Sequence, residues 1–314
     1  MFAQFKTLPQ LFDFFKDEQT CLEYWEQIRW GGEPECPHCG HNQAYKTDRG
    51  YKCKNKECQK KFTSKVGSIF ESSKLPLRTW FGAIYLCCNH KKGVSSMQIA
   101  RDLGIHQKSA WFMLHRIRET FREINPQILG GEGVIVEADT TIVGGKAKNM
   151  HTKKRMDTLN PKRGGKGNKT HIAAYLERGG SVRMDVVDSH EKENELLVKH
   201  VCTSSVLMTD TAANLRAVGR NYAFHGVVDH SRDEYVCKEN KAIHTNTVEG
   251  VFSQFDRMVM GTYHNISKKH MQAYANECAY RYNTRKSQDP IRFECVVLRC
   301  SGVRVKYNVL TGKA

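Results

Sequence analysis

The sequence predicts an α/β fold in its second half, preceded by two small modules. Three observations lead to this prediction. Between residues 130 and 290, short segments rich in Val, Ile, Ala and Leu alternate with segments of helical periodicity. Four of the 12 cysteines gather between residues 36 and 58, and a helical pattern interrupted by a glycine follows over residues 75–123. The 314 residues suffice for two or three domains.

The start of the chain predicts no targeting or membrane segment. Residues 1–33 are apolar in places, and we interpret them as an N-terminal helical segment. They lack the basic start, continuous apolar run and small-residue cleavage site of a signal peptide. No stretch approaches the roughly 20 apolar residues that a membrane helix needs. We therefore expect a cytoplasmic protein without a membrane partner.

The cluster of cysteines predicts a zinc ribbon over residues 34–66. Two thiols separated by two residues are followed, 13 residues later, by two thiols separated by four. Four thiolates around a tetrahedral Zn²⁺ make a closed structural site. Gly40 suits the first turn because glycine tolerates a positive φ, and residues 51–53 and 61–63 have the pattern of short strands. His38 and His41 are substitute ligands, and four reduced cysteines are the alternative. The predicted ligands are Cys36, Cys39, Cys53 and Cys58.

Residues 75–123 predict a helix-turn-helix that binds DNA. Ser95 or Ser96 can cap its first helix, and Gly104 occupies the turn. The second helix, which would enter the major groove with its N-terminus first, begins near His106. An ordinary helical hairpin is the alternative. The candidate DNA contacts are Gln107, Lys108, Arg116 and Arg118.

Charge favours nucleic acid as the partner. The net charge is +16, and residues 34–129 alone carry +10. From Lys146 to Lys169 there are nine basic residues and one acidic residue. A single basic run is often only a solvated surface, but several in one chain favour a polyanion. The basic segment 291–314 has no assignable function.

The order of elements in the second half is typical of a ribonuclease-H-like fold. Three strands are followed by a helix, a strand, a helix, a strand and further helices. The predicted strands are 133–139, 171–177, 181–187, 205–209 and 224–228, and the longest helical patterns are 191–201 and 247–283. Residues 178–180 form the turn of a hairpin. We therefore predict a ribonuclease-H-like catalytic domain over residues 130–290.

Three acidic residues mark the candidate catalytic site of this domain. Asp139 ends the first predicted strand, Asp210 follows the fourth, and Glu249 begins the next helix. In such a fold the two strands are neighbours, so the carboxylates would meet at one edge. Clustered carboxylates suit two Mg²⁺ or Mn²⁺ ions, which can activate an attacking oxygen and stabilise the leaving oxygen of a phosphodiester. Taken singly, an acid at a strand end is more often a cap or a surface residue.

These features together resemble the bacterial insertion-sequence transposases of the ISXO-two-like group, from about Leu11 to Arg285. The segments that carry the resemblance are RWGGEPECPHCG, YKCKNKECQKKFTSKVGSIFESSKLPLRTWFGAIY, VEADTTIVGGKAKN, LMTDTAANL and HTNTVEGVFSQFDRMVMGTYHNISKKHMQAYANECAYRYNTR. The resemblance implies a DDE-type transposase that binds terminal inverted repeats and performs metal-dependent nicking and strand transfer. It also implies double-stranded DNA as the partner, at the element ends and at the target, a homo-oligomer in the DNA complex, and a location at the bacterial nucleoid.

The resemblance further assigns roles to particular residues. It implies that Asp139, Asp210 and Glu249 form the metal-binding triad, with Asn246 as a secondary candidate because it lies one helical turn before Glu249. His244, Arg281 and Asn283 match polar positions around the family's site. The expected DNA-facing loop and helix contribute Lys146, Lys148, Lys153, Lys154, Arg155 and Arg257.

The chain departs from the family pattern at two positions. Thr140 stands where the family usually has Glu, and Asp256 stands where it often has Lys. An acid at a DNA-facing position would repel phosphate, so an inactive copy is one alternative. A sequence-specific DNA-binding regulator without cutting activity is the second, and a ribonuclease-H-like nuclease without strand transfer is the third.

Overall fold

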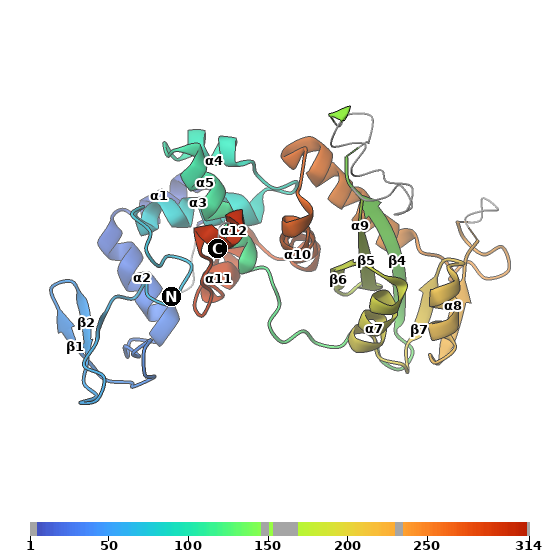
Figure 1. The fold of residues 1–314 in the computed structure, drawn as a ribbon, viewed down its shortest axis with the longest axis horizontal. Coiled ribbons are helices and arrows are strands. Elements are labelled where there is room, and N and C mark those ends of the chain that lie inside the picture. Colours follow the sequence, from blue (N-terminus) through green and yellow to red (C-terminus); the bar gives the residue numbers. More distant parts are fainter. Residues whose placement is uncertain (1–4, 146–150, 153–168, 230–234, 313–314) are drawn as a thin grey trace. The chain divides into compact units, whose positions relative to one another are not determined.

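The computed structural model describes residues 5–145, 151–152, 169–229 and 235–312. The chain divides into two compact units (Figure 1). One contains residues 1–121 together with 286–314, and the other contains residues 122–285. The run Lys146–Lys169 lies almost wholly outside the described residues, as do five predicted DNA contacts: Lys146, Lys148, Lys153, Lys154 and Arg155.

The first unit is a helical bundle that carries a small sheet. Its helices are α1 (Leu8–Phe14), α2 (Glu18–Trp30), α3 (Leu77–Asn89), α4 (Ser96–Asp102), α5 (Gln107–Glu119), α11 (Asp289–Leu298) and α12 (Tyr307–Thr311). Aromatic side chains from distant parts of the sequence form its core: Phe15, Phe81 and Phe293 pack with ring centroids 4.7–6.0 Å apart. Helix α11, from the predicted C-terminal segment, therefore packs into the core of this unit.

The small sheet contains three antiparallel strands, β1 (Ala44–Thr47), β2 (Gly50–Cys53) and β3 (Lys61–Phe62), in that order. β2 and β3 correspond to the two short strands that the sequence predicts. Tyr51 and Phe62 stack at 5.8 Å between ring centroids, and Trp30 at the end of α2 contacts both rings. The sheet is thus held against α2 by aromatic packing.

Helices α4 and α5 are joined by a short turn that the sequence predicts in detail. Ser95 caps α4, because its hydroxyl accepts a hydrogen bond from the Gln98 amide. Gly104 has a φ of +62°, the left-handed conformation that favours glycine. Ile105 donates its backbone amide to the Ala100 carbonyl at 3.0 Å, which closes the turn.

The second unit is built on a five-stranded sheet in the order β6-β5-β4-β7-β8. The strands are β4 (Ile135–Val143), β5 (Thr170–Glu177), β6 (Val182–Val187), β7 (Val206–Thr209) and β8 (Phe224–Val227). β4, β5 and β6 pair in antiparallel fashion, whereas β4 pairs with β7 and β7 with β8 in parallel. The first and fourth strands of this unit are therefore neighbours, as predicted.

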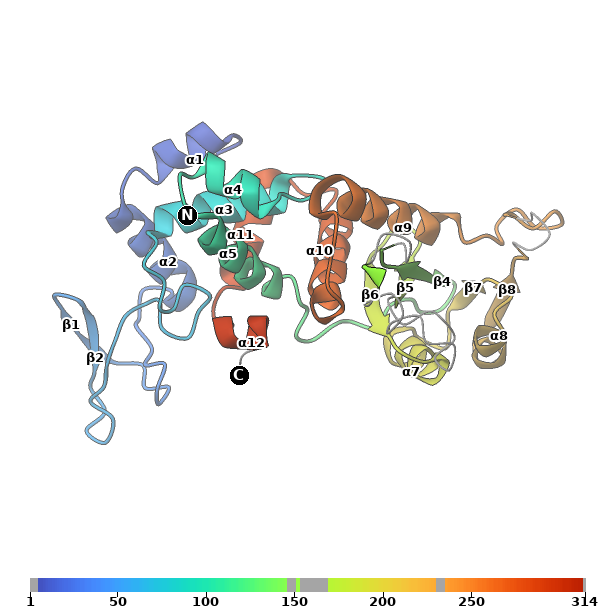
Figure 2. The ribbon, with the colours of Figure 1, turned by 45° about the horizontal axis from the view of Figure 1, so that its top comes forward.

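Helices cover both faces of this sheet (Figures 1 and 2). α7 (His190–His200) and α8 (Ala213–Gly219) pack on the face that carries Val136 and Ala138 of β4. α9 (Asn246–Met258) and α10 (Met271–Asn283) pack on the opposite face, which carries Val143. Because side chains alternate along a strand, Glu137 and Asp139 share the α9 face, and Thr140 points to the α7 side.

Two predicted boundaries are wrong. β4 continues to Val143 because it pairs with β5 as far as Thr170, so Asp139 lies within the strand and not at its end. The predicted helix 247–283 is interrupted after α9 by a π-helical turn, Val259–Tyr263, and by His264 with a φ of +57°. No helix among the described residues is both long and apolar enough to cross a membrane.

Candidate functional site

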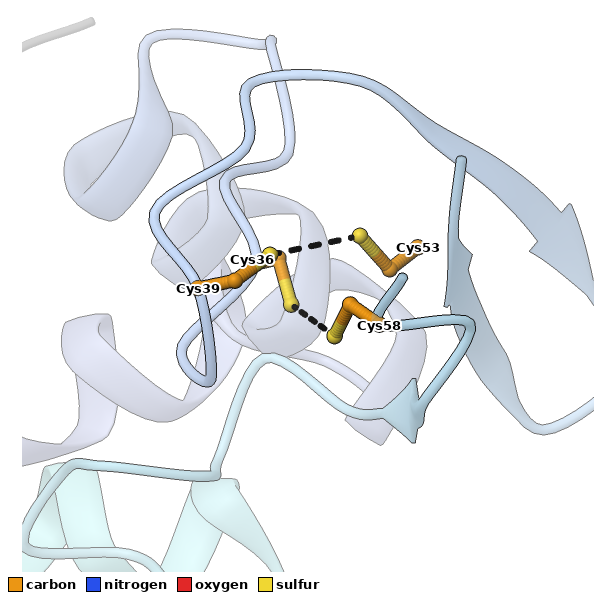
Figure 3. A group of neighbouring side chains, drawn as sticks. All are labelled: Cys36, Cys39, Cys53 and Cys58. Carbon is orange, nitrogen blue, oxygen red and sulfur yellow. Dashed lines mark hydrogen bonds between the residues drawn. The ribbon is translucent and has the colours of Figure 1, made fainter. Parts of the chain in front are cut away.

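Four cysteines converge at one end of the small sheet (Figure 3). The Sγ atoms of Cys36, Cys39, Cys53 and Cys58 all lie within 4.8 Å of one another. Cys39 and Cys53 are 3.6 Å apart, and Cys36 and Cys58 are 3.8 Å apart. Four sulfurs bound at 2.3 Å to a tetrahedral Zn²⁺ would be about 3.8 Å from one another. The cluster therefore fits zinc, and neither His38 nor His41 belongs to it.

The turns that carry these cysteines explain their convergence. The Gly40 amide donates to the Cys36 carbonyl at 2.9 Å, and Gly40 has the predicted positive φ, +72°. In the second turn the Cys58 amide donates to the Asn55 carbonyl, and Gln59 adopts a φ of +45°. A hydrogen bond from the His41 amide is the largest cause that lowers the pKa of the Cys39 thiol, to about 7, whereas burial raises the pKa of Cys53. Cys39 thus readily supplies a thiolate for a metal.

Asp139 and Asp210 are brought together by the parallel pairing of β4 and β7. Glu137 pairs with Met208, so continuing the register by two residues places Asp139 level with Asp210. Asp210 directly follows β7, and its carboxylate accepts a hydrogen bond from the Ala212 amide at 3.0 Å. The Asp139 carboxylate accepts one from the Thr140 amide at 2.7 Å.

Glu249 comes to the same region from the first turn of α9. The helix lays Val248, Val251 and Phe252 on the sheet, and this packing holds Glu249 beside the edge of the apolar face. The buried Thr245 hydroxyl donates to the Glu249 carboxylate at 3.3 Å and so fixes its direction.

The electrostatics of Asp139 show that these acids sense one another. Burial and, to a smaller extent, the negative charges of Asp210, Glu249 and Glu193 raise the pKa of Asp139, and the hydrogen bond from the Thr140 amide lowers it. The net result is a pKa of about 7. A divalent cation would relieve this repulsion, and carboxylate oxygens are the ligands that Mg²⁺ and Mn²⁺ prefer. The donor set therefore fits such ions. Among the described residues, only the four cysteines form a group of three or more metal-ligating side chains close enough together to share one ion.

Glu193 is the member of this acidic group that the sequence reasoning missed. It lies in the first turn of α7 and is only 5% exposed. Its carboxylate accepts hydrogen bonds from the Thr140 hydroxyl and, at 2.9 Å, from the Asn214 amide. The buried carboxylate thus lies beside Thr140. A lone Glu in a helical pattern carries no signal that would have identified it.

Three further polar residues that the resemblance assigns to the site, Asn246, His244 and Arg281, differ from one another in burial and partners. Asn246 is exposed at the start of α9. His244 contacts Arg178 and Glu137, and burial lowers its pKa. Arg281 is buried in an ion pair with Glu277 on α10.

Asn283 does not lie among the acids. Its side chain bonds both the amide and the carbonyl of Val182, at 2.8 and 3.1 Å. It therefore fastens the end of α10 to β6.

The predicted DNA contacts on α5 divide into two groups. Lys108 is exposed, and Gln107 is partly exposed with its amide bonded to Ser96. Arg116 is only 6% exposed: it donates to the carbonyls of Ile69, Glu71 and Val305. The prediction for Arg116 is therefore wrong, because this side chain holds the unit together.

Arg118, also predicted to contact DNA, is only 2% exposed, so this prediction is wrong because the side chain is buried. On α9, Arg257 and the unusual Asp256 are both exposed.

Comparison with known proteins agrees with this arrangement. Residues 16–61 match the family model of the transposase zinc-ribbon domain, and residues 128–283 match that of the ISXO2-like transposase domain. The chain is also similar to a protein of Halobacterium salinarum described as an uncharacterized protein in transposable element ISH50. The two are 24% identical over 275 residues, which cover 83% of this chain and 89% of the relative.

A cysteine cluster in a zinc-ribbon domain followed by a transposase domain on a mixed sheet defines a transposase of an insertion sequence. The chain belongs to the ISXO2-like transposase family.

Proposed function

We propose that this protein binds the terminal inverted repeats of its element and catalyses metal-dependent cleavage and strand transfer of DNA. The observation that carries the proposal is the raised pKa of Asp139, to about 7, in a group with Asp210 and Glu249. Burying carboxylates next to one another is unfavourable for folding and is typical of sites that act on a ligand.

The fold of the second unit supports the same chemistry. Its strand order, with an antiparallel hairpin beside a parallel pair, supports the ribonuclease-H-like fold that we propose for this unit. We infer that Asp139, Asp210 and Glu249 hold two Mg²⁺ or Mn²⁺ ions. Such ions activate a water or a 3′-hydroxyl and stabilise the leaving oxygen of a phosphodiester. The chain itself supplies the carboxylates, from β4, from the residue after β7 and from α9.

The first unit supplies the proposed DNA-end recognition. We propose that α4 and α5 are a helix-turn-helix, with Gln107 and Lys108 at the start of the reading helix. The zinc-bound sheet next to α2 adds exposed lysines. Arg257 and the basic run that includes Lys146, Lys148, Lys153, Lys154 and Arg155 remain proposed phosphate contacts.

An oligomeric state and a cellular location follow from this proposal. Joining two DNA ends requires that they be held together, so we propose a homo-oligomer in the DNA complex. Because its proposed substrates are DNA, we expect the protein at the nucleoid.

Asn246, exposed one turn before Glu249, remains a secondary candidate for the metal site.

Cleavage and joining of labelled inverted-repeat DNA by the purified protein test the proposal. The zinc-loaded protein is incubated with Mg²⁺ or Mn²⁺ beside the Asp139→Asn variant. We expect wild type to nick and join the ends, and the variant to bind but not cut. Binding without cutting by wild type would favour a regulator or an inactive copy. Cutting without joining would favour a nuclease.

A further inference from the structure

A buried ion pair behind the acidic group has no role in the proposed chemistry, yet it touches the element that carries Glu249. Glu137 lies on β4, two residues before Asp139, and is fully buried at 0% exposure. Its Oε1 accepts the Arg178 Nε–H at 2.6 Å. A buried carboxylate is unfavourable unless several donors satisfy it, so each of its partners is informative.

The remaining partners of Glu137 lie in the first turn of α9. Its Oε2 accepts the backbone amides of Thr247 and Val248, both at 2.9 Å, and Oε1 accepts the Thr247 hydroxyl at 2.8 Å. These amides are the second and third of a helix that begins at Asn246. Thr245, at the cap position, makes no side-chain hydrogen bond to the helix amides. Glu137 therefore does for α9 what an N-cap residue ordinarily does, from a different element.

Arg178 holds the chain that leads into α9. It directly follows β5, and its guanidinium donates to the Ala242 carbonyl at 2.7 Å and to the His244 carbonyl at 2.8 Å. The backbone amide of Arg178 bonds the Ile135 carbonyl at 3.0 Å, so the residue itself is fixed on β4. The rigid fork of a guanidinium suits this arrangement better than an ammonium group would.

We propose that Glu137 and Arg178 are positioning residues that set the distance between Glu249 and Asp139, a role that rests on the proposed function. Glu249 is one residue beyond Val248, whose amide Glu137 binds, and Asp139 is two residues beyond Glu137 on the same face of β4. One buried carboxylate thus bonds the helix of one proposed ligand and belongs to the strand of the other.

The proposal is tested by the Mn²⁺ dependence of cleavage in Glu137→Gln and Arg178→Lys. Asp185→Asn is the matched control, because it exchanges a half-buried carboxylate of β6, paired with His200, for an amide in the same unit. We expect the Mn²⁺ concentration at half-maximal rate to rise about tenfold in the first two variants and not in the control. Saturating Mn²⁺ should restore most of the maximal rate. Direct Mn²⁺ titration, followed by the electron paramagnetic resonance of the free ion, should show the same loss of affinity.

The outcomes separate this proposal from the proposed function. A purely structural role would lower the maximal rate through a smaller folded fraction and leave half-saturation unchanged, which would overturn the positioning role. If Glu137→Gln does not fold, Arg178→Lys, which keeps the charge, decides the question by the same criterion. If wild type neither binds Mn²⁺ nor cleaves DNA, the proposed function fails first.

Discussion

Replacing Asp139 with asparagine should stabilise the protein when Mg²⁺ and Mn²⁺ are absent. The carboxylate lies beside Asp210, Glu249 and Glu193, and its pKa is raised to about 7 from an ordinary 3.8. The asparagine amide is neutral and nearly isosteric with the carboxylate. Its oxygen can still accept the hydrogen bond from the Thr140 backbone amide, which is 2.7 Å long in wild type. The substitution thus removes a repulsion and keeps the local hydrogen bond.

The size of the effect follows from the pKa. Ionising Asp139 at pH 8 in the folded state, relative to the unfolded chain, costs about 4 kcal/mol at 1.36 kcal/mol per pKa unit. The side chain keeps some contact with water, so we expect a gain of about 1–3 kcal/mol in the free energy of unfolding. The folded-state pKa is raised, so the cost is absent below about pH 4, grows as the pH rises to about 7, and is constant above that.

Urea unfolding of zinc-loaded protein at pH 5 and pH 8 measures this effect. Asp188→Asn, an exposed carboxylate of the same unit, is the control and should be neutral at both pH values. We expect Asp139→Asn to be more stable than wild type at pH 8. At pH 5 the variant should have a smaller advantage, because Asp139 is mostly protonated in folded wild type. Mg²⁺ should stabilise wild type more than the variant. A variant that is less stable than wild type at pH 8 would contradict the claim that ionised Asp139 destabilises the folded protein.

Three further predictions concern the first unit. Removing zinc, by chelation or by Cys39→Ser, should change tryptophan fluorescence, because Trp30 packs on Tyr51 of the metal-bound sheet; an unchanged spectrum after verified zinc loss would contradict a structural metal. Arg116→Ala should lower the free energy of unfolding by about 2–4 kcal/mol, because three carbonyls lose their donor. Lys108→Ala should leave stability unchanged, weaken DNA binding and reduce the salt slope by about one; equal loss of stability in both variants would contradict the division between them.

Periodicity and spacing predicted most of the secondary structure and the cysteine cluster. The cysteine cluster could be predicted from the sequence because the two cysteines of each pair are close together, and zinc chemistry restricts their spacing. The left-handed backbone conformations of Gly40 and Gly104 could be predicted because few residues other than glycine tolerate a positive φ. The pairing of β4 with β7 followed from the order of strands and helices.

The sequence did not reveal features that depend on contacts between distant residues. Glu193 and Glu137 are single acids whose burial depends on partners 53 and 110 positions away, Thr140 and Thr247. Arg116 has the sequence signature of a DNA contact, yet a carbonyl 189 positions away accepts from it. The helix breaks at His264 because this residue has a positive φ, which a histidine in the sequence does not predict.

The central claim is that Asp139, Asp210 and Glu249 together hold the divalent ions for DNA chemistry. Anomalous diffraction from crystals of the protein with inverted-repeat DNA and Mn²⁺ tests it most directly. We expect manganese peaks at bonding distance from the carboxylates of Asp139 and Asp210, with the Glu249 carboxylate bound to one of the ions. Manganese bound elsewhere, with these three side chains turned away from it, would contradict this assignment of the metal ligands.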